Sequence, residues 1–356
     1  METSLLNTES SPFWNLAFES QSLWWQENHD GPAFRLKQIQ KWVYEKGVLD
    51  PKVMSNLPQD LQLSLQISLK PLLEYETSLK AADGSADKHL FRCRDGAHLE
   101  SVLLRSGGRR TICLSTQVGC ALACRFCHTG LAGFKRNLSP GEIVEQVLHI
   151  NREEPERISN IVVMGMGEPM LNYDQLMIAL RQINHPDALG LGARHITIST
   201  SGVKGGILKL AKEPEQWGLA VSLHAPNDDL RTQLMPINKS LPIKDLMAEI
   251  DHYIATTKRR VSFEYIMLGD TNSSEKEARE LLGLLRGKLC HVNLIPYNPV
   301  PTLPFEATTL TRIKKFQSIL ENGRIPCTIR MEKGQDILAA CGQLAHRKVE
   351  SKTCSS

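Results

Sequence analysis

Apolar and polar residues follow two distinct patterns along most of the chain. Short apolar runs rich in β-branched residues alternate with stretches in which apolar residues return about every 3.6 positions. The expected strands are 111–115, 160–164, 195–200, 219–223, 261–267 and 291–296. The expected helices are 140–152, 173–183, 203–212, 243–256 and 274–286, and a helix near 308–322 and a strand near 327–331 follow them. Connections of this length join parallel strands through crossovers, so the pattern predicts an α/β domain with an incomplete barrel.

The first 90 residues have a different pattern. Residues 1–31 are polar with scattered aromatic side chains, and a helix or a loosely packed arm is expected there. From Pro32 apolar positions recur at helical spacing, and a second helix is expected after Pro58. This module is either a plain packing unit or a nucleic-acid-binding unit. The expected division of the chain is 1–31 as an arm, 32–90 as a helical module, 91–346 as the α/β domain with its C-terminal segment, and 347–356 as a tail.

Composition narrows the class of protein. The chain has 356 residues, of which 41% are hydrophobic, enough for a barrel of about 250 residues plus a small domain or for two domains of similar size. A net charge of +3 says little about partners, because a nucleic-acid binder would gather its positive charge on one face. No apolar run approaches the roughly 18–20 residues of a membrane span, and METSLLNTESSPFW lacks the features of a secretory signal. The nine cysteines, an odd number in a chain of this size, indicate metal binding or catalysis more than disulfides, so we expect a protein of the reducing cytoplasm.

Three of the nine cysteines lie close together in the segment GCALACRFC. Cys120, Cys124 and Cys127 follow the first expected strand of the α/β domain, and loops after barrel strands are where catalytic groups gather. Three thiolates on such a loop suit three irons of a 4Fe-4S cluster, whose fourth iron stays open for a substrate atom. The alternative is a structural zinc site, which normally needs four ligands, with the adjacent His128 as a nominal fourth.

The residues around these cysteines resemble the radical S-adenosylmethionine (SAM) superfamily, and within it the RlmN/Cfr group of RNA adenine methyltransferases. The resemblance runs from about Pro32 to Leu344. Its motifs occur in the order PAFRLKQIQKW, QVGCALACRFC, GMGEPMLN, ITISTSGV, SLHAPND, LMPIN, LIPYNP and DILAACGQL. Pro169 in GMGEP is more similar to the RlmN branch. His128 is a difference, since family members commonly have alanine there, and we expect it to affect the hydrogen bonding or the potential of the cluster.

The resemblance implies a partial (β/α)6 radical SAM barrel behind a small N-terminal helical domain. It also implies one 4Fe-4S cluster per chain, bound by Cys120, Cys124 and Cys127, and SAM as the second cofactor. The implied SAM contacts are Gly167, Glu168, Ser199, Ser222, Leu223, His224 and Asn298. Taken without the resemblance, each polar residue in this set would be a loop cap or a turn former.

The resemblance further implies a methyl carrier, because carbon 2 of adenine is not nucleophilic. Cys341 matches the cysteine that takes a methyl group from one SAM, and a second SAM yields the deoxyadenosyl radical that activates this methyl for addition to adenine. Cys113 matches the cysteine that resolves the RNA adduct through a transient disulfide with Cys341, and Glu100 matches the proton acceptor. Taken alone, these would be a helix-packing residue, a small core residue and a strand-face carboxylate.

The implied partners are 23S rRNA, tRNA at the adenosine 3′ of the anticodon, and an external electron donor such as flavodoxin; no membrane is expected, and the oligomeric state stays open. Basic side chains that would meet phosphates, or are merely solvated, are Arg105, Arg109, Arg110, Lys135, Arg136 and Lys258-Arg259-Arg260. Three alternatives remain. They are a Cfr-like C8 methyltransferase, an RlmN paralogue acting on another RNA, and a non-catalytic RNA-binding protein with a structural metal site.

Overall fold

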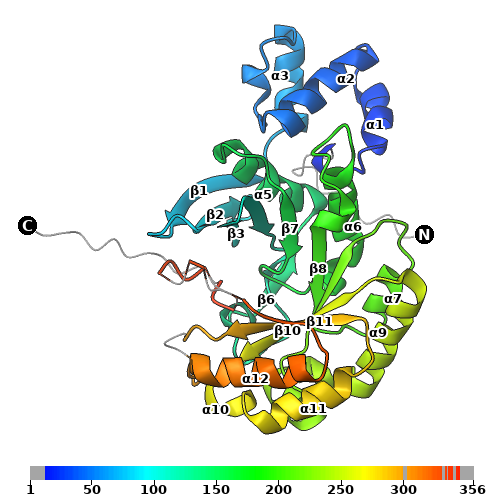
Figure 1. Cartoon of the computed structure of the whole chain (residues 1–356). Helices are drawn as coiled ribbons and strands as arrows, with labels where there is room; N and C mark the ends of the chain where they lie inside the picture. The colour runs from blue at the N-terminus through cyan, green and yellow to red at the C-terminus, as the bar shows by residue number, and fades with distance from the viewer. Residues whose placement is uncertain (1–12, 300–302, 331–332, 335, 340–341, 345–356) are drawn as a thin grey trace, which may run out of the picture.

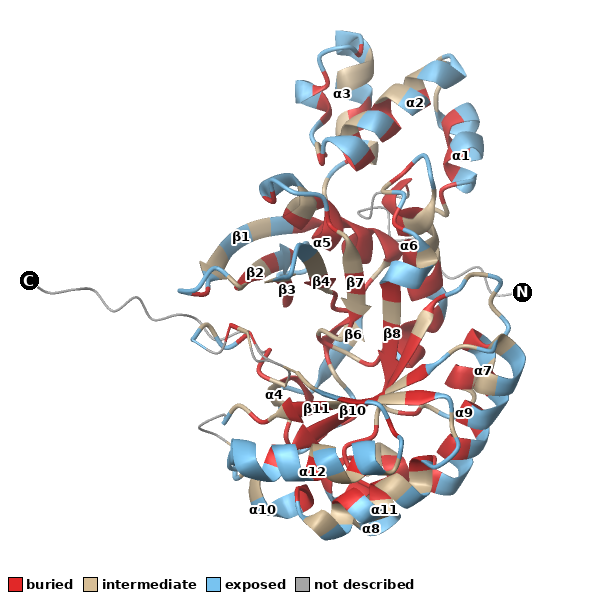
Figure 2. Ribbon diagram, in the orientation of Figure 1, coloured by how far each residue is buried: buried red, intermediate tan, exposed pale blue. Residues whose placement is uncertain are grey.

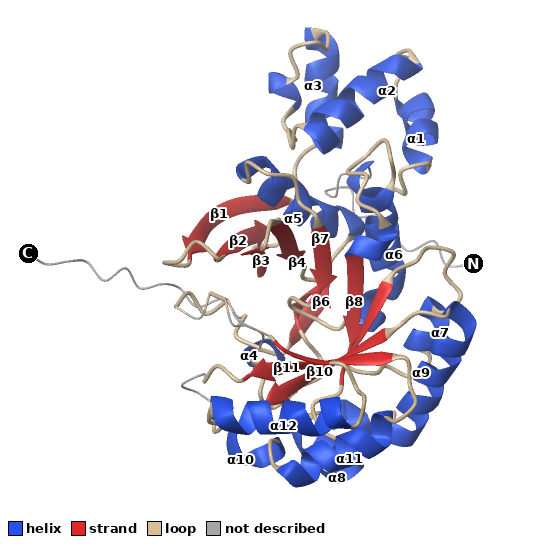
Figure 3. Cartoon of the chain, viewed as in Figure 1, coloured by secondary structure: helices blue, strands red, loops and turns tan. Residues whose placement is uncertain are grey.

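A single twisted sheet organises the α/β part of the protein (Figures 1 and 3). The computed structural model describes residues 13–299, 303–330, 333–334, 336–339 and 342–344. Within these residues the strand order is β1-β2-β3-β4-β7-β8-β9-β10-β11-β12, and β5 and β6 form a separate hairpin. The strands are β1 (Leu73–Lys80), β2 (Ala86–Cys93), β3 (His98–Ser106), β4 (Arg109–Cys113), β5 (Gln117–Gly119), β6 (Phe134–Asn137), β7 (Asn160–Val163), β8 (Ile196–Thr200), β9 (Gly218–Ser222), β10 (Val261–Met267), β11 (Cys290–Pro296) and β12 (Cys327–Ile329).

The strands from β4 and β7 to β12 are parallel, which confirms the predicted partial α/β barrel. Helices connect them on the outer face, as Figure 1 shows. The larger of these helices are α5 (Pro140–Glu153), α6 (Tyr173–Asn184), α9 (Ile243–Thr257), α11 (Glu275–Leu285) and α12 (Leu310–Asn322), and the shorter ones are α4 (His128–Leu131), α7 (Gly206–Leu210), α8 (Asp228–Leu234) and α10 (Gly269–Asn272). Ser139 and Glu142 form a capping box at the start of α5, which fixes where this helix begins.

An antiparallel meander, β1 to β4, extends the sheet at one edge. The hydrophobic pattern did not predict its first three strands, and residues 73–90 of the segment assigned to the helical module are part of them. Asp83-Gly84 lies in the turn between β1 and β2, and Asp95-Gly96 in the turn between β2 and β3, with positive φ angles at Gly84 and Gly96. Such pairs are strong hairpin signals, but the strands are rich in charged residues and lack a clear apolar alternation. The domain boundaries themselves remain predictions.

The N-terminal helices form a separate lobe above the barrel (Figure 1). They are α1 (Ser20–Asn28), α2 (Ala33–Gln40), which runs into a π-helical turn (Lys41–Glu45), and α3 (Gln59–Ser68). A buried hydrogen-bond network joins this lobe to α6. Gln21 donates to the Tyr44 hydroxyl at 2.9 Å, and that hydroxyl donates to Gln182 at 3.2 Å. Because buried polar groups are costly when unpaired, this network fixes how the lobe packs on the barrel.

Burial is concentrated on the strands and on the inner faces of the helices (Figure 2). The core includes the aromatic side chains of Trp14, Trp25, Trp217, Phe263 and Phe316, each at most 1% exposed. Among the helices that the structure describes, none combines the length and the apolar character that a bilayer crossing requires.

Candidate active site

A cavity of about 140 Å³ opens at the carboxyl ends of the parallel strands. It is the place where a barrel enzyme assembles its catalytic groups. Its lining brings together side chains and backbone that are far apart in the sequence. They come from the cysteine loop, from the segments after β7, β8 and β9, from β10 and β11, and from Gly342 near the C-terminus. The predicted site residues among them are Cys120, Cys124, Cys127, Gly167, Glu168, Ser199, Ser222 and His224.

The cysteine loop owes its shape to a close approach of two backbone segments. Gly119 has a φ of +77°, and a Cβ added there would lie 1.8 Å from the Gly133 carbonyl oxygen. That same oxygen accepts a 3.0 Å hydrogen bond from the Cys120 N–H. The Cys127 N–H then donates to the Cys124 carbonyl at 3.1 Å, which tightens the loop. Only glycine at position 119 permits this path without strain.

Of the three cysteines, Cys124 is buried, and Cys120 and Cys127 are half-buried. Burial raises the pKa of Cys120 to about 11, and burial together with Cys127 and Cys120 raises the pKa of Cys124 well above its usual value. Such thiols become thiolates only beside a compensating positive charge, which bound iron supplies. Among the described residues, no group of three His, Cys, Asp or Glu side chains is gathered closely enough for one metal ion. Three cysteines from one loop match the donor set of a cluster, in which each thiolate binds its own iron, whereas a structural zinc ion normally needs four ligands.

Glu168 is buried at the floor of the cavity, with 1% of its surface exposed. Its carboxylate accepts hydrogen bonds from the Met170 N–H at 3.0 Å and the Ser201 N–H at 2.8 Å. Burial raises the pKa of this carboxyl, and the two backbone donors oppose the rise. Gly167 precedes it with a φ of +105°, and a Cβ there would lie 2.7 Å from the Gln117 side chain. Glycine is therefore required for the turn that points Glu168 inward.

His224 follows β9 in a left-handed conformation, with a φ of 58°. Its Nδ1 accepts a 3.1 Å hydrogen bond from the Ile266 N–H, so the ring proton of the neutral imidazole is assigned to Nε2. Burial lowers the pKa of His224 to about 3, and the ring is therefore neutral at physiological pH. Its edge also packs against Phe126 of the cysteine loop, with ring centroids 4.9 Å apart.

Two of the residues that were predicted to contact SAM do not line the cavity. Leu223 is fully buried and does not line the cavity, and its carbonyl oxygen accepts from the Arg231 guanidinium at 3.2 Å. Asn298 follows β11 but is also absent from the cavity lining. A direct contact of either residue with SAM remains a prediction.

Arg231 is a site residue that the sequence analysis missed. It is fully buried, and its guanidinium donates to the carbonyl oxygens of Ser201 at 2.6 Å and Ser222 at 3.2 Å. It thereby links the backbones that follow β8 and β9. No local pattern marks this arginine, which lies in α8 among other polar residues. Its role depends on contacts between distant segments.

Glu264 and Arg330, which line the cavity, form a second unpredicted group together with Asn293 behind them. The Asn293 amide donates to Glu264 at 2.8 Å, and the Arg330 guanidinium lies 3.8 Å from the same carboxylate. Burial raises the pKa of Glu264, and Arg330 opposes the rise. The sequence could have indicated a role for Glu264, because it is an acid within the otherwise mostly apolar strand VSFEYIM, and charged residues are rarely buried without a partner.

Cys113 and Glu100 lie on the meander and not in the cavity lining. Val102 is paired with Cys113 in the sheet, and Glu100 lies two residues before Val102, so both side chains leave the same face. Glu100 is 4% exposed and its carboxylate lies 3.4 Å from the Lys88 ammonium. All the described cysteines are free thiols. Cys341 lies outside the described residues, so its predicted disulfide with Cys113 is not supported by the structure and stays a prediction.

The residues on either side of Cys341 show where its segment runs. The Ala82 N–H donates to Asp336 at 2.9 Å, and the Lys88 ammonium donates to the Leu338 carbonyl at 3.4 Å. Beyond Cys341, the Gly342 carbonyl accepts from the His128 N–H at 2.7 Å. Asp336 and Leu338 thus contact the meander, and Gly342 contacts the residue that follows the cysteine loop.

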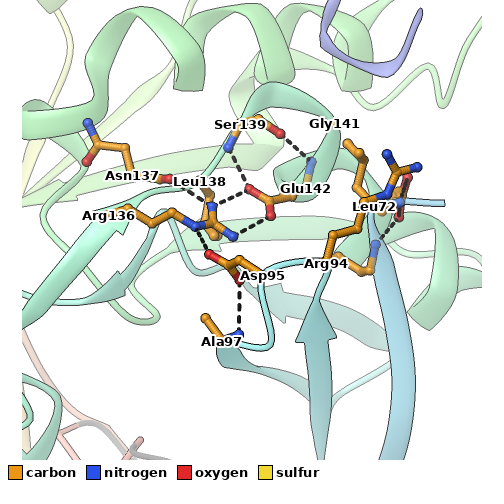
Figure 4. Close-up of polar contacts among 12 residues, drawn as sticks. Leu72, Arg94, Asp95, Ala97, Arg136, Asn137, Leu138, Ser139, Gly141 and Glu142 are labelled. Carbon is orange, nitrogen blue, oxygen red and sulfur yellow. Dashed lines mark hydrogen bonds and ion pairs between the residues drawn. The ribbon is translucent and has the colours of Figure 1, made fainter. Parts of the chain in front are cut away.

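Several of the basic residues that were predicted to contact phosphates form ion pairs within the protein. Arg136 forms a two-pronged ion pair with Glu142, both N–O distances being 2.8 Å, and also contacts Asp95 (Figure 4). Arg105 and Arg110 share the buried carboxylate of Glu154. These three guanidiniums stabilise the meander against α5. They are poorly placed to be general phosphate ligands.

A larger hollow, about 1120 Å³, lies between the helical lobe and the meander. It shares no lining residue with the cavity of the cysteine loop. Its basic lining residues are Lys70, Arg92, Arg94 and Arg152. Its size does not make it the reaction centre, because Cys120, Cys124, Cys127 and the buried Glu168 line the smaller cavity.

Comparison with known proteins agrees with this geometry. The family described as "Radical SAM superfamily" matches residues 114–282, and the "Ribosomal RNA large subunit methyltransferase N-terminal domain" matches residues 19–69. A "Probable dual-specificity RNA methyltransferase RlmN 2" of Protochlamydia amoebophila is 44% identical over 333 residues, which are 92% of this chain and 93% of the relative. An RlmN relative of Bacillus thuringiensis subsp. konkukian is 44% identical over 353 residues, covering 98% and 97% of the two chains.

A solved structure is also similar. The crystal structure of a radical SAM methyltransferase from Sphaerobacter thermophilus superposes with a TM-score of 0.90 at 44% sequence identity. The match covers 93% of this chain and 98% of the other.

Proposed function

Because the chain belongs to the RlmN family of radical SAM RNA methyltransferases, we propose that it methylates carbon 2 of a specific adenosine in 23S rRNA, and of an adenosine in tRNA, through a methylated Cys341. One observation supports this most. The cavity places the three cysteines of the loop beside Glu168, Ser199, Ser222 and His224, and its lining includes the neighbour of Cys341.

The cavity residues suit a cluster and a SAM molecule. Cys120, Cys124 and Cys127 bind the 4Fe-4S cluster, which when bound supplies the electron that cleaves SAM. Glu168 accepts from the SAM ammonium, since each of its oxygens keeps a lone pair beside the backbone bonds it already accepts. His224 donates from Nε2, because its Nδ1 is occupied by the Ile266 N–H. Ser199 and Ser222 add hydroxyl groups at the ends of β8 and β9.

The meander supplies the groups for release of the product. Cys341 takes the methyl group and becomes linked through it to the adenine. Glu100 accepts the proton that leaves carbon 2. The Cys113 thiol then loses its proton and attacks the Cys341 sulfur. The bond between that sulfur and the linking methylene carbon breaks, the carbon takes up a proton to become the methyl group, and a Cys113–Cys341 disulfide remains as the methylated RNA departs. The shared sheet face of Glu100 and Cys113, and the contact of Lys88 with Leu338, support this division of labour.

The substrates follow from the relatives. Their names specify RlmN and dual specificity, which favours the RlmN-type reaction over the Cfr-like C8 alternative. We assign the second substrate to tRNA and the electron donor to a flavodoxin-like protein. We place the enzyme in the cytoplasm, where its free thiols stay reduced.

The deciding experiment uses anaerobically reconstituted protein with dithionite, SAM bearing a CD3 group, and unmodified large-subunit rRNA or tRNA. Nucleosides are analysed by mass spectrometry. We expect C2-methyladenosine that contains two deuteriums from the transferred methyl. Three retained deuteriums would mean direct methyl transfer and would overturn the route through Cys341. C8-methyladenosine would establish the Cfr-like alternative, and SAM cleavage without methylated adenosine would point to another RNA or another reaction.

A further inference from the structure

Lys88 of β2 and Glu100 of β3 are diagonal neighbours on one face of the meander. Leu90 is paired with Glu100, and Lys88 is paired with Val102. Val102 is paired in turn with Cys113 on β4. Directly opposed residues in a sheet point to the same side, as do residues two apart along a strand. The side chains of Lys88, Glu100 and Cys113 therefore share one face.

Lys88 and Glu100 form a buried ion pair. Their charged atoms lie 3.4 Å apart, and their side chains are only 10% and 5% exposed. Two charges removed from water remain in place only when their geometry is well defined, because either charge alone would be strongly unfavourable. This pair is thus a fixed feature of the face and not an exchangeable surface contact.

The same ammonium also contacts the C-terminal segment. Lys88 Nζ donates to the Leu338 carbonyl oxygen at 3.4 Å, three positions before Cys341. Nearby, Asp336 accepts from the Ala82 N–H at 2.9 Å. Gly334 packs so closely on the meander that an added Cβ would lie 2.9 Å from the Ala86 Cβ. One side chain thus contacts both the acid of the meander and the segment that bears Cys341.

We propose that Lys88 is a positioning residue for the release of methylated RNA. This inference rests on the proposed function. The ammonium orients the Glu100 carboxylate and fixes the C-terminal segment at Leu338, so that Leu338 stays beside the face that carries Glu100 and Cys113. Transfer of the first methyl to Cys341 uses neither Glu100 nor Cys113, and release uses both. Loss of Lys88 should therefore slow the second stage far more than the first.

The test compares Lys88→Met with Lys88→Arg, in the reconstituted holoenzyme. Lys80→Met on the exposed edge strand β1 is the matched control, since it removes a lysine from the same hairpin. Three products are followed with SAM and RNA: methylated Cys341 by peptide mass spectrometry, the covalent protein–RNA adduct on denaturing gels, and free methyladenosine. We expect Lys88→Met to keep methylation of Cys341 within about twofold while release falls by about tenfold or more and adduct accumulates.

Rescue distinguishes positioning from a general structural effect. Lys88→Arg keeps the positive charge and several donors, so it should restore most of the release rate. Equal loss of Cys341 methylation and of release in Lys88→Met would overturn the proposal, as would a release rate equal to that of Lys80→Met.

Hydrogen–deuterium exchange separates this inference from the proposed function. Peptides covering residues 333–344 should exchange faster in Lys88→Met than in the wild type or in Lys80→Met, with or without turnover. Unchanged exchange would overturn the inference even if the enzyme methylates C2 of adenine. Faster exchange in a protein whose wild type never methylates Cys341 would overturn the proposed function and its release step, leaving only the docking contact.

Lys88→Met leaves Glu100 as an uncompensated buried charge and could fail to fold for that reason. A double variant addresses this case. Lys88→Met/Glu100→Gln removes both charges. Compared with Glu100→Gln alone, it should show faster exchange in the same peptides. Equal exchange in the two variants would overturn the role of Lys88.

Discussion

The backbone N–H of His128 donates a 2.7 Å hydrogen bond to the carbonyl oxygen of Gly342. His128 directly follows the last cysteine of the loop, and Gly342 directly follows Cys341. Two cysteines more than 200 positions apart thus have neighbours bonded to each other. At position 128 this chain has histidine where family members commonly have alanine. The hydrogen bond to Gly342 comes from the backbone N–H, so it does not depend on which of the two side chains is present.

Thr129 provides a removable contact at this junction. Its hydroxyl donates to the Leu344 carbonyl oxygen, and the residue is 4% exposed. We expect Thr129→Val to lower the rate of methyladenosine formation by about tenfold while SAM cleavage is retained, because a buried carbonyl loses its donor. The two rates are measured in one assay with Thr256→Val as control, since that threonine lies exposed on α9. Parallel loss of SAM cleavage would show that Thr129 serves the cluster loop alone.

Gly119 should be essential for cluster assembly. In Gly119→Ala the added methyl would meet the Gly133 carbonyl at 1.8 Å, and the backbone has a positive φ of +77°. We expect the variant to assemble well under half of the wild-type iron content after reconstitution, since strain and clash displace the loop. Gly133→Ala is the control, because it has a similar φ of +75° but open space around its Cβ. Equal iron in the two variants would refute the close-approach argument.

Arg231→Lys should weaken SAM binding without touching SAM. A lysine cannot contact Leu223, Ser201 and Ser222 together as the guanidinium does. We expect the free energy of unfolding to fall by about 2–4 kcal/mol, and the Kd for SAM to rise by about tenfold. Denaturation and equilibrium binding measure these, with exposed Arg279→Lys for comparison. A destabilised protein with unchanged SAM affinity would limit Arg231 to folding.

Cys113→Ala should trap the reaction after the RNA becomes linked to the protein. Without a thiol to attack Cys341, the adduct has no route to a disulfide, so covalent protein–RNA complex should accumulate during turnover with SAM. Denaturing gels and mass spectrometry detect it, and Cys290→Ala on β11 is the control. A variant recovered free of RNA after SAM turnover would count against the assigned role.

Acid should destabilise the meander through the buried His89 and the half-buried His149 of α5. Burial lowers the pKa of His89 and of His149 to about 4. In the unfolded chain each imidazole takes up a proton near pH 6.5, whereas in the folded protein it does so only near pH 4. The contribution of the two neutral histidines to the free energy of unfolding is therefore fully present above pH 6.5 and is lost as the pH falls toward 4. Each proton contributes a slope of about 1.4 kcal/mol per pH unit.

The matching variant is His89→Phe, since His89 is 3% exposed, packs against aromatic rings and has no hydrogen-bond partner on either ring nitrogen. Urea denaturation between pH 7 and pH 4.5 should show a shallower loss of stability than in the wild type. Exposed His252→Gln should leave the slope unchanged. An identical slope in His89→Phe would assign the acid sensitivity to other groups.

The sequence by itself determined the parallel half of the fold and the chemical class of the cavity. Strands such as Val261–Met267 are largely apolar at both alternating sets of positions, because both of their faces are covered in a parallel sheet. The three cysteines could be found together in the cavity lining, and predicted to be cluster ligands, because their spacing within one loop is a local property. Residues at the ends of consecutive parallel strands necessarily meet at one edge, so Glu168, Ser199 and Ser222 could be placed together in advance.

Only the tertiary structure decided which distant groups touch. The meander was missed because its sequence lacks a regular alternation of apolar and polar residues. Its strands are held by backbone hydrogen bonds between neighbours and by ion pairs of their side chains, such as Arg105 with Glu154. Arg231, Lys88 and the bond between His128 and Gly342 depend on segments that lie far apart in the sequence. Hydrogen bonds and buried charges act over a few ångströms, and the folded chain alone sets which atoms come within that range.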